Sequence, residues 1–101
     1  MIESVAVIGG GARSRYWGRI LASALERPLA YTAGAEVGPA FGAARLARLA
    51  ASGESVERVC TVAPIDHIIE PDRDLAERCR ERRQRYRELY RALRERFPRP
   101  S

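Results

Sequence analysis

Apolar positions in the first third of the chain predict a strand, a helix and a second strand. Val5 to Ile8 are consecutive apolar residues that three glycines follow, which is typical of a buried strand ending in a tight loop. Ser14 suits the N-cap of a helix that runs to Leu25. One face of that helix is apolar and carries Trp17, Ile20, Leu21 and Ala24. Pro28 blocks continuation of the helix, and Leu29 to Tyr31 predict the second strand.

The rest of the chain has a mostly helical pattern. Pro39 suits a first helical position and Gly53 a C-terminal stop, so a helix is predicted between them. Because its side chains are mainly alanine, we expect this helix to be buried against a sheet or another backbone. Residues 55–73 are predicted to be irregular or briefly helical. A long helix is predicted from Asp74 to Phe97. Its apolar stripe consists of Leu75, Cys79, Tyr86, Leu89, Tyr90, Leu93 and Phe97.

The order strand, helix, strand, helix, long helix predicts an α/β fold with parallel strands. The 101 residues suffice for one domain, and no repeat or linker divides them. However, two short parallel strands do not form an independent sheet, because parallel pairing needs several strands covered on both faces. The chain also begins almost directly on its first strand. We therefore expect it to be part of a larger domain.

The net charge of +5 is concentrated at one end of the chain. Residues 1–70 hold seven arginines and seven acids, whereas residues 71–101 hold eleven arginines and six acids. Every basic residue is arginine, which favours a codon bias over a phosphate-binding patch. Acids also stand at helical spacing from arginines, in the pairs Asp74 and Arg78, Glu81 and Arg85, and Glu88 and Arg91. The last helix is therefore interpreted as a solvated outer face, with an interaction or nucleic-acid-binding module as the alternative.

The sequence contains no signal for a membrane protein, a secreted protein, a metal site or a catalytic triad. No apolar run reaches the roughly 18 residues of a membrane span, and no secretory signal pattern opens the sequence. Cys60 and Cys79 form no CxxC motif, so neither a zinc site nor a disulfide scaffold is predicted. The single histidine, His67, is predicted to be a loop residue, with no partners for a catalytic triad or a metal. We expect no catalytic residue, no metal ligand, no membrane contact and a cytoplasmic location.

The glycine loop is the feature most suggestive of a ligand. A strand that ends in glycines and feeds a capped helix directs backbone N–H groups at one spot, which suits an anion or the phosphates of a nucleotide. A plain tight turn is the alternative. A P-loop is excluded because the chain contains no lysine. A dinucleotide fingerprint would run from Gly9 through Gly11 to Ser14, but the second strand lacks the acid that would hold a ribose. That interpretation stays open as a weaker alternative.

Three segments together carry a family resemblance. They are Ile8-Gly9-Gly10-Gly11-Ala12-Arg13-Ser14 with Trp17, Gly38-Pro39-Ala40-Phe41-Gly42-Ala43-Ala44-Arg45-Leu46, and Glu70-Pro71-Asp72 leading into an Arg- and Tyr-rich helix. They resemble the C-terminal domain of the FGGY carbohydrate kinases, over residues 5–97. Within that family the chain looks most like the bacterial xylulose kinases. It departs from the family at Glu26, where a glycine usually ends the helix.

The resemblance implies the C-terminal part of an actin-like ATPase domain of the sugar kinase, ribonuclease H-like kind, with residues 1–101 holding its adenosine-motif half. Such kinases transfer the γ-phosphate of ATP, with Mg²⁺, to a sugar hydroxyl. The resemblance assigns nucleotide binding to Gly9, Gly10, Gly11 and Ala12, the last three against the α-phosphate and ribose. It also gives Arg15 a polar contact with the adenine.

The family's catalytic Asp, sugar site and phosphate loop precede the matched segment. The resemblance therefore implies ATP or ADP and the missing N-terminal portion of a kinase as partners, and leaves a homodimer open. It also implies that the chain does not phosphorylate a sugar by itself.

Overall fold

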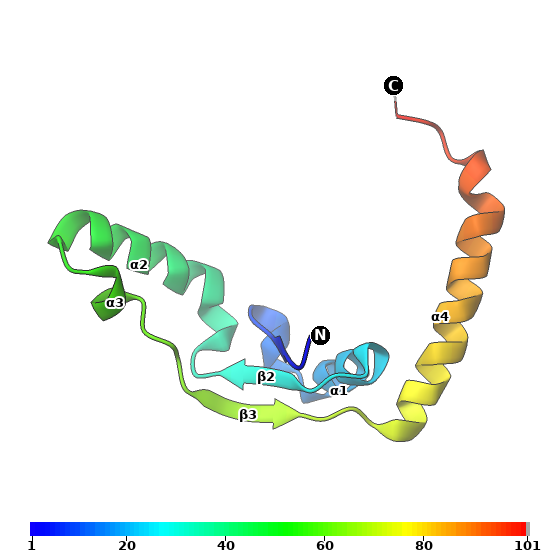
Figure 1. Cartoon of the computed structure of the whole chain (residues 1–101), viewed down its shortest axis with the longest axis horizontal. Coiled ribbons are helices and arrows are strands. Elements are labelled where there is room, and N and C mark those ends of the chain that lie inside the picture. The colour runs from blue at the N-terminus through cyan, green and yellow to red at the C-terminus, as the bar shows by residue number, and fades with distance from the viewer. Residues whose placement is uncertain (101) are drawn as a thin grey trace.

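The computed structural model describes residues 1–100, which form a three-stranded sheet with helices attached to it (Figure 1). The strands are β1 (Val5–Ala6), β2 (Leu29–Thr32) and β3 (Ile65–Ile69). The helices are α1 (Arg15–Leu25), α2 (Gly38–Ser52), α3 (Val56–Val59) and α4 (Arg73–Leu93). Short 3-10 turns lie at Gly10–Arg13, Ala35–Val37 and Arg94–Arg96. The α/β character predicted from the sequence is confirmed.

The sheet has the order β1-β2-β3 and is mixed rather than parallel. The predicted parallel pairing of the first two strands is confirmed, with Val5 opposite Leu29. The third strand was not predicted, and it runs antiparallel to β2 with His67 opposite Tyr31. The expectation that residues 55–73 hold no strand is therefore wrong. The reason is non-local, because the backbone of β3 becomes a strand by pairing with β2, more than 30 residues earlier in the chain.

β1 is shorter and more exposed than the sequence indicates. It spans two residues instead of four, and Ile8 beyond it is 59% exposed. Val5 and Val7 are partly buried against the core, while Ala6 and Ile8 face away from it. The prediction of a fully buried strand is wrong because β1 lies at the edge of the sheet and packs on one face only.

α1 covers the sheet and makes the core. Ala22, Leu29 and Tyr31 form the buried cluster, and the helix approaches β2 closely enough that a Cβ on Gly18 would lie 2.3 Å from Tyr31 Oη. The predicted N-cap is confirmed, because Ser14 Oγ accepts from the Trp17 N–H at 3.1 Å. The buried face differs from the predicted one, since it consists of Gly18, Ala22 and Ser23.

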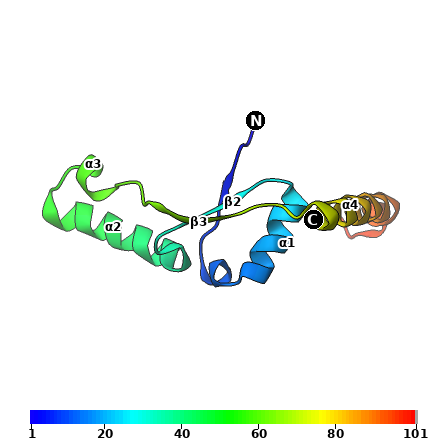
Figure 2. The same ribbon diagram turned by 90° about the horizontal axis from the view of Figure 1, so that it is seen from below.

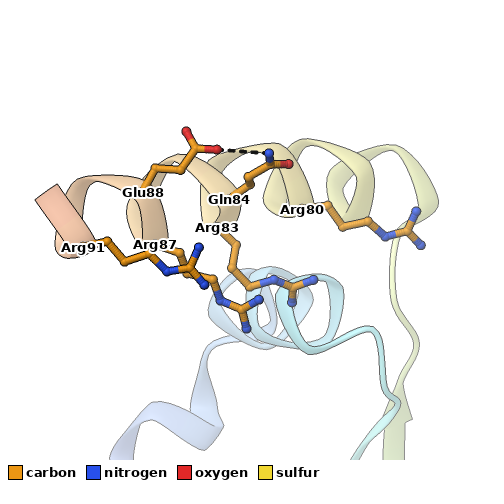
Figure 3. Close-up of a pocket in the computed structure, with 6 residues that line it drawn as sticks. All are labelled: Arg80, Arg83, Gln84, Arg87, Glu88 and Arg91. Atoms are coloured by element: carbon orange, nitrogen blue, oxygen red, sulfur yellow. Dashed lines mark hydrogen bonds between the residues drawn. The ribbon is translucent and has the colours of Figure 1, made fainter.

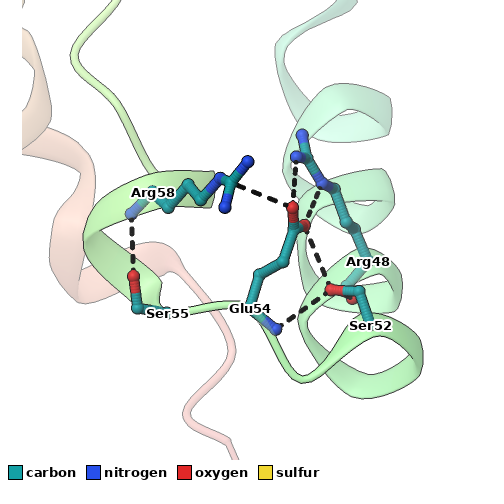
Figure 4. Close-up of polar contacts among 5 residues, drawn as sticks. All are labelled: Arg48, Ser52, Glu54, Ser55 and Arg58. Atoms are coloured by element: carbon teal, nitrogen blue, oxygen red, sulfur yellow. Dashed lines mark hydrogen bonds and ion pairs between the residues drawn. The ribbon is translucent and has the colours of Figure 1, made fainter.

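α2 is exposed, which corrects the expectation that its small side chains are buried. None of its residues is buried, and a Cβ on Gly42 would meet nothing within 4 Å. Its predicted ends are confirmed by Pro39 in the first turn and by Gly53, whose φ is 68°. Beyond the C-terminal end of α2, the Glu54 carboxylate accepts a hydrogen bond from Arg48 Nε at 2.5 Å and lies 3.7 Å from Arg58 Nε. These two ion pairs hold α3 beside α2 (Figure 4).

α4 begins one residue earlier and ends sooner than predicted. Asp72 is its N-cap, with Oδ1 accepting from the Leu75 N–H at 2.9 Å, and Leu93 is its last residue. The predicted pair of Glu81 with Arg85 is confirmed at 2.6 Å. The pairs of Asp74 with Arg78 and Glu88 with Arg91 do not form within residues 1–100. Glu88 instead accepts from Gln84 Nε2 at 3.1 Å.

The molecule is an open structure with two helical arms. α2 and α4 extend to opposite sides of the sheet (Figure 2), and the radius of gyration is 18.8 Å. A compact chain of this length has about 13 Å. Large apolar side chains remain exposed on the arm formed by α4, Tyr86, Leu89, Tyr90 and Phe97 among them. Among the described helices, none is both long and apolar enough to cross a bilayer.

Candidate functional site

The glycine segment lies at the junction of β1 and α1. Gly9 has a φ of 93°, which glycine adopts without strain, and its N–H donates to the Ala35 carbonyl at 2.8 Å. The chain then makes the 3-10 turn Gly10–Arg13, in which the Ala12 N–H donates to the Gly9 carbonyl at 3.0 Å. Ser14 follows directly as the N-cap of α1. The turn is thereby fixed between the sheet and the N-terminus of a helix.

Two backbone donors of this turn are free for a ligand. Within residues 1–100, no acceptor pairs with the N–H of Gly10 or of Gly11. A Cβ on Gly10 would meet nothing within 4 Å, so the space above it is open. A Cβ on Gly11 would lie 3.5 Å from Trp17 Cδ1, which places the indole beside the turn. Unpaired N–H groups next to a helix N-terminus suit an anionic ligand.

A cavity of about 320 Å³ adjoins the turn. Ala12 of the turn and Thr32 at the carboxyl end of β2 both line it. Glu36 and the neighbouring Asp66 and His67 complete its polar lining. The cavity is of a size that takes a small ligand group.

His67 is a residue of this cavity that sequence reasoning misplaced. It lies on β3 instead of in a loop, with its ring stacked on Tyr31 at a centroid distance of 4.5 Å. Its Nδ1 lies 2.7 Å from Asp66 Oδ2. The adjacent Asp66 and His67 are visible in the sequence, but only the pairing of β3 with β2 brings them to this cavity.

Arg15 lies apart from the cavity. It lines a different hollow on the surface, between α1 and the connection from β3 to α4, together with Arg19 and residues 68–72. The structure therefore brings Gly9 to Ala12 together as one turn and places Arg15 on another side of α1.

Burial changes the chemistry of one group beside the site. Tyr31 is 2% exposed, and its hydroxyl has no hydrogen-bond partner among the described residues. Desolvation raises the pKa of this phenol above its ordinary value. Across residues 1–100, no group of three or more His, Cys, Asp or Glu side chains could hold a metal ion. The hollow beside the turn thus combines a buried neutral phenol with the carboxylates of Glu36 and Asp66.

Comparison with known proteins gives matches of one kind. The chain is 42% identical over 92 residues to a xylulose kinase of Escherichia coli strain K12, which covers 90% of this chain and 19% of that protein. It is 49% identical over 53 residues to a xylulose kinase of Klebsiella pneumoniae, which covers 52% of this chain and 11% of that protein. No family model matches the chain.

A solved structure shows the same similarity in three dimensions. The crystal structure of a xyloylose kinase from Brucella ovis superposes with a TM-score of 0.70 at 41% sequence identity. The match covers 93% of this chain and 19% of that one. The chain therefore spans about a fifth of the length of the E. coli and Brucella proteins.

Proposed function

We propose that this chain, which is homologous to the xylulose kinases, is the C-terminal part of an ATP-dependent sugar kinase of the FGGY type. The observation that carries the proposal is the 42% identity to the E. coli xylulose kinase over 92 residues, a span that takes in 90% of this chain. In the complete enzyme the reaction would be phosphorylation of D-xylulose to xylulose 5-phosphate. The actin-like ATPase fold belongs to the same proposal.

The role of this chain is to supply the adenosine side of the ATP site. The unpaired N–H groups of Gly10 and Gly11 would donate to oxygen atoms of the nucleotide, and the open space at Gly10 permits its close approach. The N-terminus of α1 adds a partial positive charge in the same place. Gly9 and Ala12 hold the shape of the turn through the hydrogen bond between them.

Phosphoryl transfer needs further groups that must come from elsewhere in the kinase. Mg²⁺ neutralises charge on the phosphates, and a base accepts the proton of the sugar hydroxyl. The resemblance places the catalytic Asp and the sugar site before the matched segment. We therefore expect the chain by itself to bind the nucleotide without transferring a phosphate.

Nucleotide titration of the full chain, with ATP, ADP and NAD as ligands, tests this role. We expect binding of ATP and ADP and none of NAD. Gly10→Ala should weaken ATP binding about tenfold, because the new Cβ fills the space that the nucleotide needs. The substitution leaves the fold unstrained, since Gly10 has no positive φ and its Cβ meets no atom within 4 Å.

Gly42→Ala is the matched control, because its Cβ also meets nothing but lies on α2, away from the turn. Equal ATP affinity in the Gly10→Ala and Gly42→Ala variants would contradict the assignment of the turn. Preferential binding of NAD would favour the dinucleotide alternative. Xylulose-dependent ATP turnover by the chain alone would show that its own residues suffice for catalysis.

A further inference from the structure

The outer half of α4 combines an apolar stripe with arginines along both of its borders. Tyr86, Leu89, Tyr90 and Leu93 are all exposed, by between 38% and 70%, and Phe97 follows them at 53%. Their spacing of three and four residues places them on one face of the helix. This surface is called the α4 stripe below.

Arginines flank the α4 stripe on each side. Arg85 precedes Tyr86 by one position and Arg87 follows it by one, so the turn of the helix places the two arginines on opposite sides of the stripe. Glu81, Glu88 and Glu95 repeat every seven residues, so they share a different face. Charge on α4 is therefore sorted, with arginine beside the apolar face and glutamate away from it.

One border of the stripe already shows how its arginines are satisfied. Arg80, Arg83, Arg87 and Arg91 form a row along α4 and line a hollow of about 380 Å³ (Figure 3). The inner two bind Glu26 at the end of α1, and Arg83 also donates to the Ala24 carbonyl at 3.1 Å. The outer two, Arg87 and Arg91, have no carboxylate within ion-pairing distance in the described part of the chain.

We propose that the α4 stripe docks on a polypeptide surface that is apolar at its centre and carries carboxylates at its rim. The remaining portion of the sugar kinase supplies that surface, and to this extent the inference rests on the proposed function. Carboxylates of the partner meet Arg87 and Arg91 as Glu26 meets Arg80 and Arg83. The length of the relatives supports a polypeptide occupant, because about four fifths of the E. coli protein lies outside the match.

Two other occupants are outcomes of the test. A second copy of α4 would bring arginine borders against arginine borders, which costs free energy through like-charge repulsion. An anionic membrane surface would attract the arginines, and the glutamates on the other face of the helix would not oppose it. The polypeptide is preferred because about four fifths of the E. coli protein lies outside the match.

A fusion protein tests the docking, with this chain replacing the matching fifth of the E. coli xylulose kinase. Leu89→Glu places a charge in the stripe, and we expect it to lower the melting temperature of the fusion by about 3 °C or more. Leu89→Met keeps an apolar side chain at the same position, so it should leave the melting temperature of the fusion unchanged. Ala92→Glu is the matched control, because it adds the same charge at an exposed position off the stripe and should shift the melting temperature by less than about 1 °C.

Equal effects of Leu89→Glu and Ala92→Glu in the fusion would overturn the proposal, as would a fusion that does not fold. A dimer of the unfused chain that Leu89→Glu dissociates would assign the stripe to a second copy instead. Binding of the unfused chain to phosphatidylserine vesicles, if Leu89→Glu abolished it, would assign the stripe to a membrane. Xylulose-dependent ATP turnover by the fusion is measured separately. A fusion that lacks turnover but keeps the Leu89-specific destabilisation contradicts the proposed function and leaves the docking supported.

Discussion

Gly18 and Gly42 show how differently two helical glycines are used. Both stand in helices, and the alanine-rich sequence around Gly42 predicts that its helix packs closely against another backbone. The structure assigns it to Gly18, where a Cβ would lie 2.3 Å from Tyr31 Oη and 2.7 Å from Ile69 Cδ1. Gly42 faces open space. The amino-acid composition of a helix predicts that it can pack closely against a neighbour. Only the position of the neighbouring element decides at which glycine the close contact occurs.

The contrast gives a paired prediction for the residue scale. Gly18→Ala should destabilise the contact of α1 with the sheet by about 1–3 kcal/mol, because Tyr31 and Ile69 must move to admit the Cβ. Gly42→Ala should stabilise α2 by up to about 1 kcal/mol through helix propensity alone. Amide hydrogen exchange in α1 and α2 measures both effects locally. Unchanged exchange in α1 of the Gly18→Ala protein would show that the packing at this glycine is loose.

At the scale of elements, Glu26 joins α1 to α4 at the cost of backbone strain. It ends α1 with a φ of 54°, a left-handed conformation that glycine adopts more easily. The side chain explains the choice, because its carboxylate binds Arg80 and Arg83 of α4. A second link of the same kind joins Arg19 of α1 to Asp72 at 2.8 Å. Glycine at position 26 would relieve the backbone but break the first link.

This link predicts a pH dependence of the α1–α4 contact. The hydrogen bond from Arg80 holds the pKa of Glu26 below its ordinary value of 4.5. A lowered pKa in the folded state means that the stabilisation is fully present above pH 4.5 and is lost as the pH falls through the folded value. Protection of the first half of α4 against amide exchange, relative to the intrinsic rate at each pH, should therefore fall below that pH, and Glu26→Gln should show the lower protection already at pH 7.

Glu81→Gln is the control for this prediction. Glu81 pairs with Arg85 four residues along the same helix, so its loss leaves the junction with α1 unchanged. If the two variants exchanged alike at pH 7, the Glu26 link would not hold α4 in place. The carboxylate of Asp72 also has a lowered pKa, because it accepts from the Leu75 N–H and binds Arg19, so the transition at low pH is expected to involve both acids.

At the scale of the whole molecule, the arms are only loosely coupled to the core. The buried cluster consists of Ala22, Leu29 and Tyr31, and it lies under α1. α2 has no buried residue, and every residue of α4 beyond Arg80 is exposed. A core of this size cannot hold both arms in one cooperative unit.

We therefore expect the chain alone to unfold without a single sharp transition. Fluorescence of Trp17 reports on α1, whereas circular dichroism at the helix band is dominated by α2 and α4. The two signals should change at different temperatures, because the arms melt independently of the core. Coincident, sharp curves from a monomer would show that the chain is a complete folding unit.

The sequence predicts most of what is local in this protein. The Ser14 cap, the stop at Gly53 and the parallel pairing of the first two strands follow from short-range patterns, and the structure confirms them. The family resemblance follows from segments whose residue types are specific, and the homology to xylulose kinases confirms it. The assignment of the nucleotide to Gly9, Gly10, Gly11, Ala12 and Arg15 stays a prediction.

Tertiary structure alone decides what depends on distant partners. β3 becomes a strand only because β2 offers it an edge, and that pairing brings His67 and Asp66 to the cavity beside the glycine turn. Helix periodicity shows that α2 and α4 have small or apolar faces, yet burial requires a second surface. Within residues 1–100 that surface exists for Gly18 of α1 but not for α2 or the α4 stripe. A pattern fixes which face of an element can be buried, whereas the rest of the fold decides whether it is.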